Sequence, residues 1–201
     1  MGVAVITDNT SFIIGYRSNY VTGASYDKDT NDENYLQGPW GNRQTNVTGC
    51  TLTNSLEDAL LDFNGKTNTK AMCDSHAGVG SAWNGDINPD EAKYWGAPAA
   101  SQCYFYYSRG NIGRNNWWLP SVGEMNTIIN NIDLINNCVQ KLGSQFLHTN
   151  NGYSIYYWTS TQYDIGYAWS WQNIYSNNTY TNIFDKHSKY SYNNIIPITT
   201  L

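Results

Sequence analysis

The stretch Asn116-Trp117-Trp118-Leu119-Pro120-Ser121-Val122-Gly123-Glu124-Met125 contains the clearest structural signals in the chain. Its aromatic residues predict a short strand that ends at Pro120. Ser121 is suited to cap the helix that follows, and Glu124, three residues later, completes a capping box. Apolar residues at helical spacing continue this helix through Ile132, and a second helical segment is expected over 134–142. The chain therefore changes from strand to helix at Pro120 and Ser121.

Before this junction, the sequence predicts two short strands, a long loop and three helices. The loop is polar and rich in Gly, Asn and Thr, which is typical of surface segments. The caps and the apolar spacing define the helices, and residues 78–95 are expected to be irregular. The expected strands cover 3–6 and 12–15, the loop covers 17–48, and the helices cover about 55–63, 67–76 and 98–106.

After Gly143, the character of the sequence changes to short aromatic strands separated by turn residues. Residues 150–194 contain 8 Asn, 9 Tyr and 6 Ser, which together make up 23 of these 45 residues. A helical first half followed by an antiparallel second half is an α+β arrangement, and no linker divides it, so one domain over 1–201 is expected. The expected strands cover Ser154–Thr161, Tyr167–Gln172, Asn178–Phe184 and Asn194–Thr199.

The composition excludes several classes of protein. Of 201 residues, only 13% are charged, and the net charge is −5 without a basic block, so no nucleic-acid partner is expected. No apolar run approaches the roughly 18 residues of a membrane-spanning helix, so direct membrane insertion is not expected. The first residues lack the basic and apolar regions of a signal peptide, which is either absent or already removed. The compartment therefore stays open on composition alone.

No pattern indicates an enzyme. Cys73 and His76 are neighbours on one helix, but the dipole at its C-terminal end opposes a thiolate, and no third residue orients the histidine. Glu124 and Asp133 offer paired carboxylates of the kind used in glycoside hydrolysis. The capping box explains Glu124 better, and a helix junction explains Asp133.

Neither a cofactor nor a metal site is expected. The stretches over 27–31 and 86–90 begin like calcium loops but lack the Gly and Glu of an EF-hand, which leaves calcium in an irregular loop as an alternative to a solvated acidic loop. His148 and His187 have no second pair of ligands at a metal-binding spacing. The four cysteines contain no C-x-x-C pair and allow three disulfide connectivities. We expect most of them to be reduced and buried.

The order of several motifs resembles a bacterial and phage family of C-type-lectin-like domains. The family pattern is W-x-L-P-[ST]-x-x-E, then Y-W-[ST]-S-T, then A-W, then V-R-P-V. Here the matching segments lie within roughly residues 56–198, but Ile196 stands where the family usually has Arg, so no role of that Arg carries over. The segments are 117–125, Tyr157-Trp158-Thr159-Ser160-Thr161, Ala168-Trp169 and Ile195-Ile196-Pro197-Ile198, with 62–69 and 98–103 also similar.

The resemblance implies a C-type-lectin-like fold, in which helices flank a small twisted antiparallel sheet and a polar surface near the C-terminus faces the ligand. Related domains are the variable proteins of diversity-generating retroelements, in which mutagenesis of AAY codons produces Asn, Tyr, Ser and similar residues. The implied function is binding of a protein or glycan receptor on another cell or particle, at a bacterial cell surface or a phage tail, with a homo-oligomer as an option. The alternative is a structural or assembly module of a surface, pilus-tip or tail protein without diversification.

The expected variable and ligand-binding region covers about 154–196. Tyr and Trp offer rigid contact area there, and Asn and Ser offer adaptable hydrogen bonds, as in antibody paratopes. We expect the scaffold to comprise Trp117, Trp118, Leu119, Trp158, Ala168 and Trp169. Strand alternation predicts that Ala168, Ser170 and Gln172 share the displayed face. The expected recognition residues, mostly exposed and on one side, are Asp164, Ile165, Tyr167, Ser170, Gln172, Tyr175, Asn177, Tyr180, Asn182, His187, Ser188, Tyr190, Tyr192 and Asn193.

Overall fold

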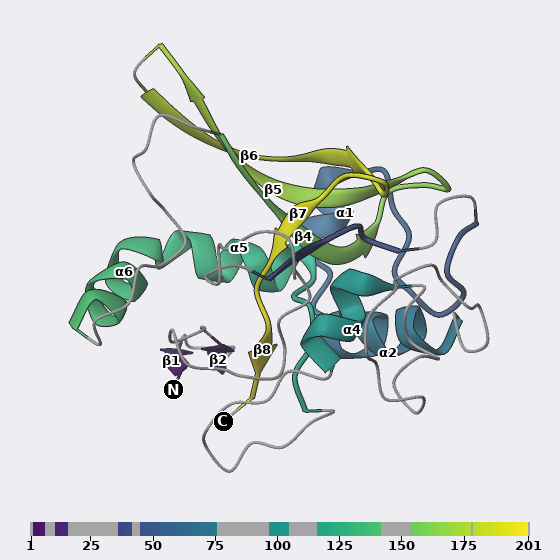
Figure 1. Ribbon diagram of the computed structural model, residues 1–201, viewed down its shortest axis with the longest axis horizontal. Helices are drawn as coiled ribbons and strands as arrows, with labels where there is room; N and C mark the ends of the chain where they lie inside the picture. The colour runs from purple at the N-terminus through teal and green to yellow at the C-terminus, as the bar shows by residue number, and fades with distance from the viewer. Residues whose placement is uncertain are drawn as a thin grey trace, which may run out of the picture.

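The computed structural model has an α+β fold, as the sequence predicts (Figure 1). It describes residues 2–6, 11–15, 36–41, 45–75, 97–104, 116–141, 154–177 and 179–200. Within these ranges, two sheets and a set of short helices form the structure. No helix there is both long and apolar enough to cross a lipid bilayer.

The larger sheet has five strands in the order β3-β7-β4-β5-β6, and the smaller has three in the order β1-β2-β8. Neighbouring strands are antiparallel except β4 and β7, which are parallel. The two N-terminal strands confirm the sequence prediction. The bounds are β1 (Gly2–Ile6), β2 (Ser11–Gly15), β3 (Leu36–Gly38), β4 (Ile155–Gln162), β5 (Tyr167–Ser176), β6 (Thr179–Ser188), β7 (Asn193–Ile195) and β8 (Ile198–Thr199).

Helices cover both faces of the larger sheet. Successive residues of a strand point to opposite faces, and in β4 Trp158 packs with the helices on one side while Tyr157 packs with those on the other. The predicted helices are all present, although their ends differ by a few residues. Trp158 packs against α2 (Gly65–Ser75) and α4 (Pro98–Tyr104), Tyr157 against α5 (Val122–Asn130) and α6 (Ile132–Lys141), and α1 (Leu56–Leu60) lies near the start of α5.

The helix start at the 116–125 junction forms as predicted, but the strand expected before Pro120 is only an isolated bridge at Trp118; the junction touches both sheets. Trp118 exchanges two backbone hydrogen bonds of 2.9 Å with Ile198 of β8. The Pro120 carbonyl accepts from the Ser160 N–H of β4 at 2.8 Å. The capping box is confirmed, since the Ser121 N–H donates to Glu124 Oε2 at 2.8 Å. The local cap therefore also sets where α5 begins relative to the sheet.

Asp62, in the loop between α1 and α2, is a buried hydrogen-bonding centre. Its Oδ2 accepts from Asn68 Nδ2 at 3.0 Å and from Thr161 Oγ1 at 2.7 Å. Its Oδ1 accepts from Thr51 Oγ1 at 3.1 Å. Its backbone carbonyl accepts from Ser121 Oγ at 2.6 Å and from the Gly123 N–H, in the first turn of α5, at 3.0 Å. Asp62 thus connects the segment that contains Thr51 with α2, α5 and β4.

Three expectations need correction or extension. The single strand expected over Asn194–Thr199 is wrong, because the chain there forms two strands in different sheets, β7 in the larger and β8 in the smaller. The surface loop expected over 17–48 is wrong where the structure describes it, because β3 forms there and Trp40 is fully buried, with its Nε1 donating to the Thr159 carbonyl at 2.7 Å. Strands β5 and β6 are each ten residues long, several residues longer than expected. Their polar residues pair across the hairpin, as in the 2.6 Å bond from Asn173 Nδ2 to Asn182 Oδ1.

The expected scaffold residues are all buried: Trp117, Trp118, Leu119, Trp158, Ala168 and Trp169. Ile196, at the position where the similar family has Arg, is also buried and packs in the cluster that includes Trp118. The four cysteines are unpaired, and all but Cys138 are buried. The core therefore agrees with the pattern of large apolar residues read from the sequence.

Gly123 should resist substitution because the start of α5 lies directly against the α1–α2 loop. A Cβ there would lie 2.5 Å from the Asp62 carbonyl oxygen and 2.7 Å from that of Leu60. We expect Gly123→Ala to lower the free energy of unfolding by about 2 kcal/mol or more, since overpacking outweighs the gain in helix propensity. Urea unfolding of the variant measures this loss.

The matched control is Gly166→Ala, because the nearest atom to a Cβ at that position is 3.9 Å away. Its free energy of unfolding should change by less than about 0.5 kcal/mol. Equal losses in the two variants would contradict the role of close backbone packing at Gly123.

Candidate functional site

Two turns distant in sequence meet at one end of the five-stranded sheet. The β4–β5 turn covers 163–166, and the β6–β7 turn covers 189–192. In the first, Asp164 Oδ1 accepts from the backbone N–H groups of Gly166 and Tyr167, both at 2.8 Å. In the second, the Ser191 N–H donates to the Ser188 carbonyl at 2.8 Å. Side-chain and backbone hydrogen bonds thus fix each turn internally.

Lys189 joins these two turns from the inside. Its backbone N–H donates to the Gly166 carbonyl at 3.0 Å, and its Nζ donates to the Ile165 carbonyl at 3.4 Å and to Gln162 Oε1 at 3.1 Å. The Nζ also lies 4.6 Å from the ring centroid of Trp40, a cation–π contact. Burial lowers the pKa of Lys189 to about 8. The Lys189 ammonium group is therefore stabilised by two oxygen acceptors and the face of the Trp40 ring. No carboxylate contacts it directly in the described structure.

Gln162 in turn ties this region to the N-terminal half. Its Oε1 accepts from the Val47 N–H at 2.9 Å, and its Nε2 donates to the Val47 carbonyl at 3.1 Å. The carboxamide thus pairs with one backbone unit as a strand neighbour would. Gln162, Lys189 and Trp40 were not among the residues predicted to matter. Lys189 is one of only four charged residues over 150–194, and a lysine in so weakly charged a stretch was the one signal that could have found this group.

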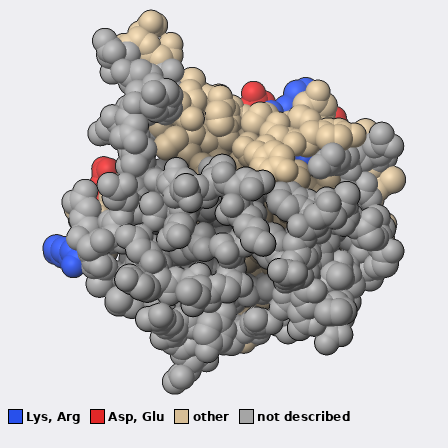
Figure 2. Space-filling model, viewed as in Figure 1, with Lys and Arg blue, Asp and Glu red and all other residues tan. Residues whose placement is uncertain are grey.

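The two joined turns display large side chains to solvent. We call the set Ile165, Tyr167, Tyr190 and Tyr192 the turn surface; their exposed fractions are 55%, 41%, 49% and 62%. Lys186 Nζ lies 5.3 Å from the Tyr167 ring centroid. In Figure 2, the described surface over β5 and β6 carries few charged side chains, in keeping with the low charge of this part of the chain. This end of the sheet combines exposed aromatic area with a fixed backbone.

The structure does not bring all the predicted recognition residues together. Tyr167, Asp164 and Ser188 lie at the end of the sheet that carries the turn surface, whereas Asn177 and Asn182 lie toward the tip of the β5–β6 hairpin, which projects from the body in Figure 1. Ten strand residues separate these ends by about 30 Å. The side chains of Tyr175 and Tyr180, near the tip, lie outside the described part of the structure.

The predicted residues also divide between the two faces of the sheet. Directly paired residues of antiparallel strands point to the same face. Tyr167 pairs with Ser188, so both share the face of Trp169, while Ala168 pairs with His187 on the opposite face. The prediction of a single displayed face is therefore wrong for β5 and β6.

Three predicted recognition residues are buried rather than displayed. Ser170 is fully buried, Gln172 is 7% exposed and Asn193 is 2% exposed. Ala168, expected beside Ser170 and Gln172 on the displayed face, is buried too. The prediction assumed that one face of the sheet is open, whereas helices and the 40–50 segment cover the middle of both faces.

The candidates for chemistry gain no support. Burial raises the pKa of the Cys73 thiol to about 12, which keeps it protonated at neutral pH. His76 and His148 lie outside the described residues, as do the two acidic stretches over 27–31 and 86–90. In the described ranges, no three His, Cys, Asp or Glu side chains converge as a metal ion requires.

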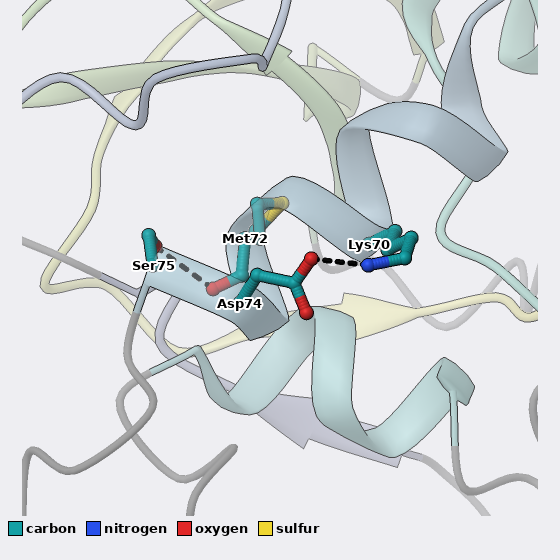
Figure 3. Close-up of polar contacts among 4 residues, drawn as sticks. All are labelled: Lys70, Met72, Asp74 and Ser75. Carbon is teal, nitrogen blue, oxygen red and sulfur yellow. Dashed lines mark hydrogen bonds and ion pairs between the residues drawn. The ribbon is translucent and has the colours of Figure 1, made fainter.

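A hollow of about 500 Å³ lies beside the C-terminal end of α2, lined in part by Asp74 and Ser75. Two of the polar groups that line it, on Asp74 and Ser75, are engaged within the helix (Figure 3). The Asp74 carboxylate pairs with Lys70 one turn earlier, and the Ser75 hydroxyl donates to the Met72 carbonyl at 3.0 Å. The contacts among these four residues stabilise the end of the helix and do not prepare a reacting group.

Among the described carboxylates, Glu124 has the most strongly shifted pKa. Burial raises its pKa from 4.5 to about 7, against the lowering effect of hydrogen bonds from Ser121 and Trp118, while the charge of Asp62 raises it further. Trp118 Nε1 lies 3.3 Å from both carboxylate oxygens. These contacts belong to the cap of α5, and Asp133 is exposed on α6. The pair therefore does not line a common cleft in the described structure.

Comparisons with protein-family models, with curated proteins and with solved structures find no match to this chain.

The raised pKa of Glu124 predicts a specific pH dependence of stability. The folded state keeps its proton up to about pH 7, whereas the unfolded state releases it near pH 4.5, so this contribution to stability falls as the pH rises between these values. The total loss corresponds to about 3 kcal/mol. Glu124→Gln should therefore be more destabilising, relative to the native chain, at about pH 4 than at about pH 8.

Urea unfolding of both proteins at the two pH values measures this difference. The other titrating groups cancel, because they are common to the two proteins. A difference in unfolding free energy between variant and native chain that is the same at both pH values would contradict the buried, protonated state of Glu124.

Proposed function

We propose that this chain is a ligand- or receptor-binding protein built on a C-type-lectin-like scaffold, and that the turn surface is its principal contact area. The observation that carries this proposal is the joining of two distant turns by Lys189, which holds exposed Ile165, Tyr167, Tyr190 and Tyr192 at one end of the sheet. Rigid aromatic side chains with few rotors lose little entropy on binding. Low charge limits the cost of removing water from this surface.

We further propose that the chain is a variable protein of a diversity-generating retroelement. The motif order and the Asn, Tyr and Ser content of 150–194 support this. The division of this stretch into buried and exposed positions supports it as well, because a diversified surface needs a framework that tolerates change around it. Trp158, Trp169 and Lys189 are buried framework positions, whereas Tyr190 and Tyr192 are exposed.

The proposed partner is a protein or glycan receptor on another cell or particle. A bacterial cell surface or a phage tail is the proposed place of action, in line with the resemblance. No nucleic acid is proposed as a partner, since the chain has 11 Lys and Arg against 16 Asp and Glu.

The second candidate function is an assembly module whose surfaces pack on its own subunits or on neighbouring proteins. Exposed apolar side chains favour it, since large apolar patches on protein surfaces often mark interfaces. They lie away from the turn surface in sequence, on and around α1 and on α6: Leu52, Leu56, Leu61, Phe63 and Leu134.

Sequencing this gene across its source population tests the diversification. We expect substitutions at exposed positions such as Ile165, Asn182, Tyr190 and Tyr192. Trp158, Trp169, Gln162 and Lys189 should be constant, because they bury large or hydrogen-bonded side chains. A uniform sequence over 162–194 would reject diversification and leave a generic binding or assembly domain.

A binding assay tests the turn surface. Labelled protein would be applied to a glycan array and to a panel of bacterial cells, and the double variant Tyr190→Ala and Tyr192→Ala should lose at least about tenfold in apparent affinity, as central aromatic contacts do. The matched control, Phe63→Ala, removes a comparably exposed aromatic ring (46%) elsewhere.

Loss of binding in the control, with the double variant unaffected, would place the contact at the α1 side and favour the assembly module. Light scattering of the native chain and of both variants reports whether the substitution that removes binding also changes the oligomeric state.

A further inference from the structure

Lys186 of β6 places its ammonium group over two tyrosine rings beside the turn surface. Its Nζ lies 4.9 Å from the ring centroid of Tyr163 and 5.3 Å from that of Tyr167. Both distances are within the range of a cation–π contact. In the described structure, Lys66 and Lys189 each lie over a single ring. The position of the Lys186 ammonium group is therefore one at which two rings attract the same cation.

The two rings are held in place without the lysine. The Tyr163 N–H donates to the Tyr167 carbonyl at 3.1 Å across the β4–β5 turn, so the two side chains leave the backbone next to each other. Tyr163 also packs edge-on against Trp169, with ring centroids 5.1 Å apart and an interplanar angle of 63°. Trp169 is buried, and its Nε1 donates to the Thr53 carbonyl at 2.8 Å. The rings should therefore keep their positions when Lys186 moves away.

The Lys186 ammonium group marks a space that a ligand can enter. Lys186 and Tyr167 are exposed, and Tyr163 is half-buried. Within the described ranges Lys186 makes no ion pair. The carboxylate of the adjacent Asp185 accepts from the backbone N–H of Lys186 at 2.7 Å, and the two side chains point to opposite faces of the sheet. Because the lysine stem is flexible and its charge is well hydrated, Lys186 can turn into solvent and leave the ring faces open.

We propose that Tyr163 and Tyr167 form a subsite for a trimethylammonium group of the ligand, such as that of choline, and that Lys186 occupies this subsite when no ligand is bound. This proposal rests on the proposed binding function and names the chemistry of one part of the ligand. A trimethylammonium group has no N–H to donate to water, so it loses less solvation on the ring faces than the strongly hydrated lysine ammonium does. It is therefore the cation that displaces Lys186.

The charges of this turn also favour a cationic ligand group. Asp164, between the two tyrosines in sequence, accepts from the N–H groups of Gly166 and Tyr167, both at 2.8 Å, so its carboxylate is fixed in the turn. An anionic group that paired with Lys186 would be repelled by this carboxylate. Lys189 is fully buried over Trp40 and does not present its charge to the surface.

Ligand-observed NMR with the intact chain tests the subsite. The probe is choline. Its controls are ethanolamine, which keeps the charge without the methyl groups, and 3,3-dimethylbutan-1-ol, which keeps the shape without the charge. We expect saturable binding of choline and at least about tenfold weaker binding of both controls. Vesicles of phosphatidylcholine form a second arm, which distinguishes a lipid headgroup from a soluble ligand that carries choline.

Two substitutions should change choline binding in opposite directions. Lys186→Gln removes the internal competitor and should tighten choline binding by about threefold or more. Tyr167→Leu removes an exposed ring face and should weaken choline binding by at least about tenfold. The matched controls are Lys66→Gln, which removes a lysine over the buried Trp118 ring, and Phe63→Leu, which removes an exposed ring elsewhere. Both controls should bind choline within about twofold of the native chain, because they lie outside the subsite.

Equal binding of choline and 3,3-dimethylbutan-1-ol overturns the proposal, and so does unchanged or weaker choline binding in Lys186→Gln. The melting temperature of each variant shows that it is folded, so that a loss of binding in Tyr167→Leu is not a loss of structure. The proposed function is judged separately. If the double variant of Tyr190 and Tyr192 loses receptor binding while the native chain binds no choline, the turn surface stands and this subsite falls.

Discussion

The buried carboxylate of Asp62 is the constraint on which the remaining architecture depends. Its two oxygens and its carbonyl accept from Thr51, Asn68, Thr161 and Ser121, which belong to four separate parts of the chain. A buried carboxylate lowers stability unless its hydrogen bonds are made. These four segments are therefore expected to take up their positions cooperatively. Because Thr161 also receives the Val122 N–H at 3.1 Å, the end of β4 and the start of α5 share one network. The turn after β4, which carries Ile165 of the turn surface, begins two residues beyond Thr161.

Local chemistry accounts for what the sequence could predict. The cap at Ser121 and the apolar spacing of α5 involve residues within one or two turns of each other, so pattern and structure agree there, whereas the strand expected before Pro120 is reduced to a single bridge between Trp118 and Ile198. The burial of Trp158 and Trp169 also follows from the size and apolarity of the indole group. The α+β class follows from the order of such segments, and it agrees with the structure.

The errors arise where long-range packing decides. Alternation along β5 correctly separates Ala168 from Trp169, but it does not say whether the opposite face is open, and here it is covered. Ser170 and Gln172 are therefore buried, although their polarity indicated exposure. Trp40 and Lys189 are close in space because the Trp40 N–H donates to the Lys189 carbonyl at 3.2 Å, and nearby Gln162 binds the backbone of Val47 across 115 residues; no local pattern contains such contacts. The extra length of β5 and β6 likewise comes from cross-strand pairs such as Asn173 with Asn182, which are invisible in either strand alone.

The placement of β1 and β8 in one small sheet has a mechanical consequence. Both chain ends lie together in Figure 1, well away from the turn surface. A tension applied between the ends would be carried first by the β1–β2 and β2–β8 pairs, and then by the two hydrogen bonds between Ile198 and Trp118. The five-stranded sheet lies outside that line of force. A force applied at the turn surface would instead load Lys189 and the β5–β6 hairpin, so the two ends of the molecule would yield independently.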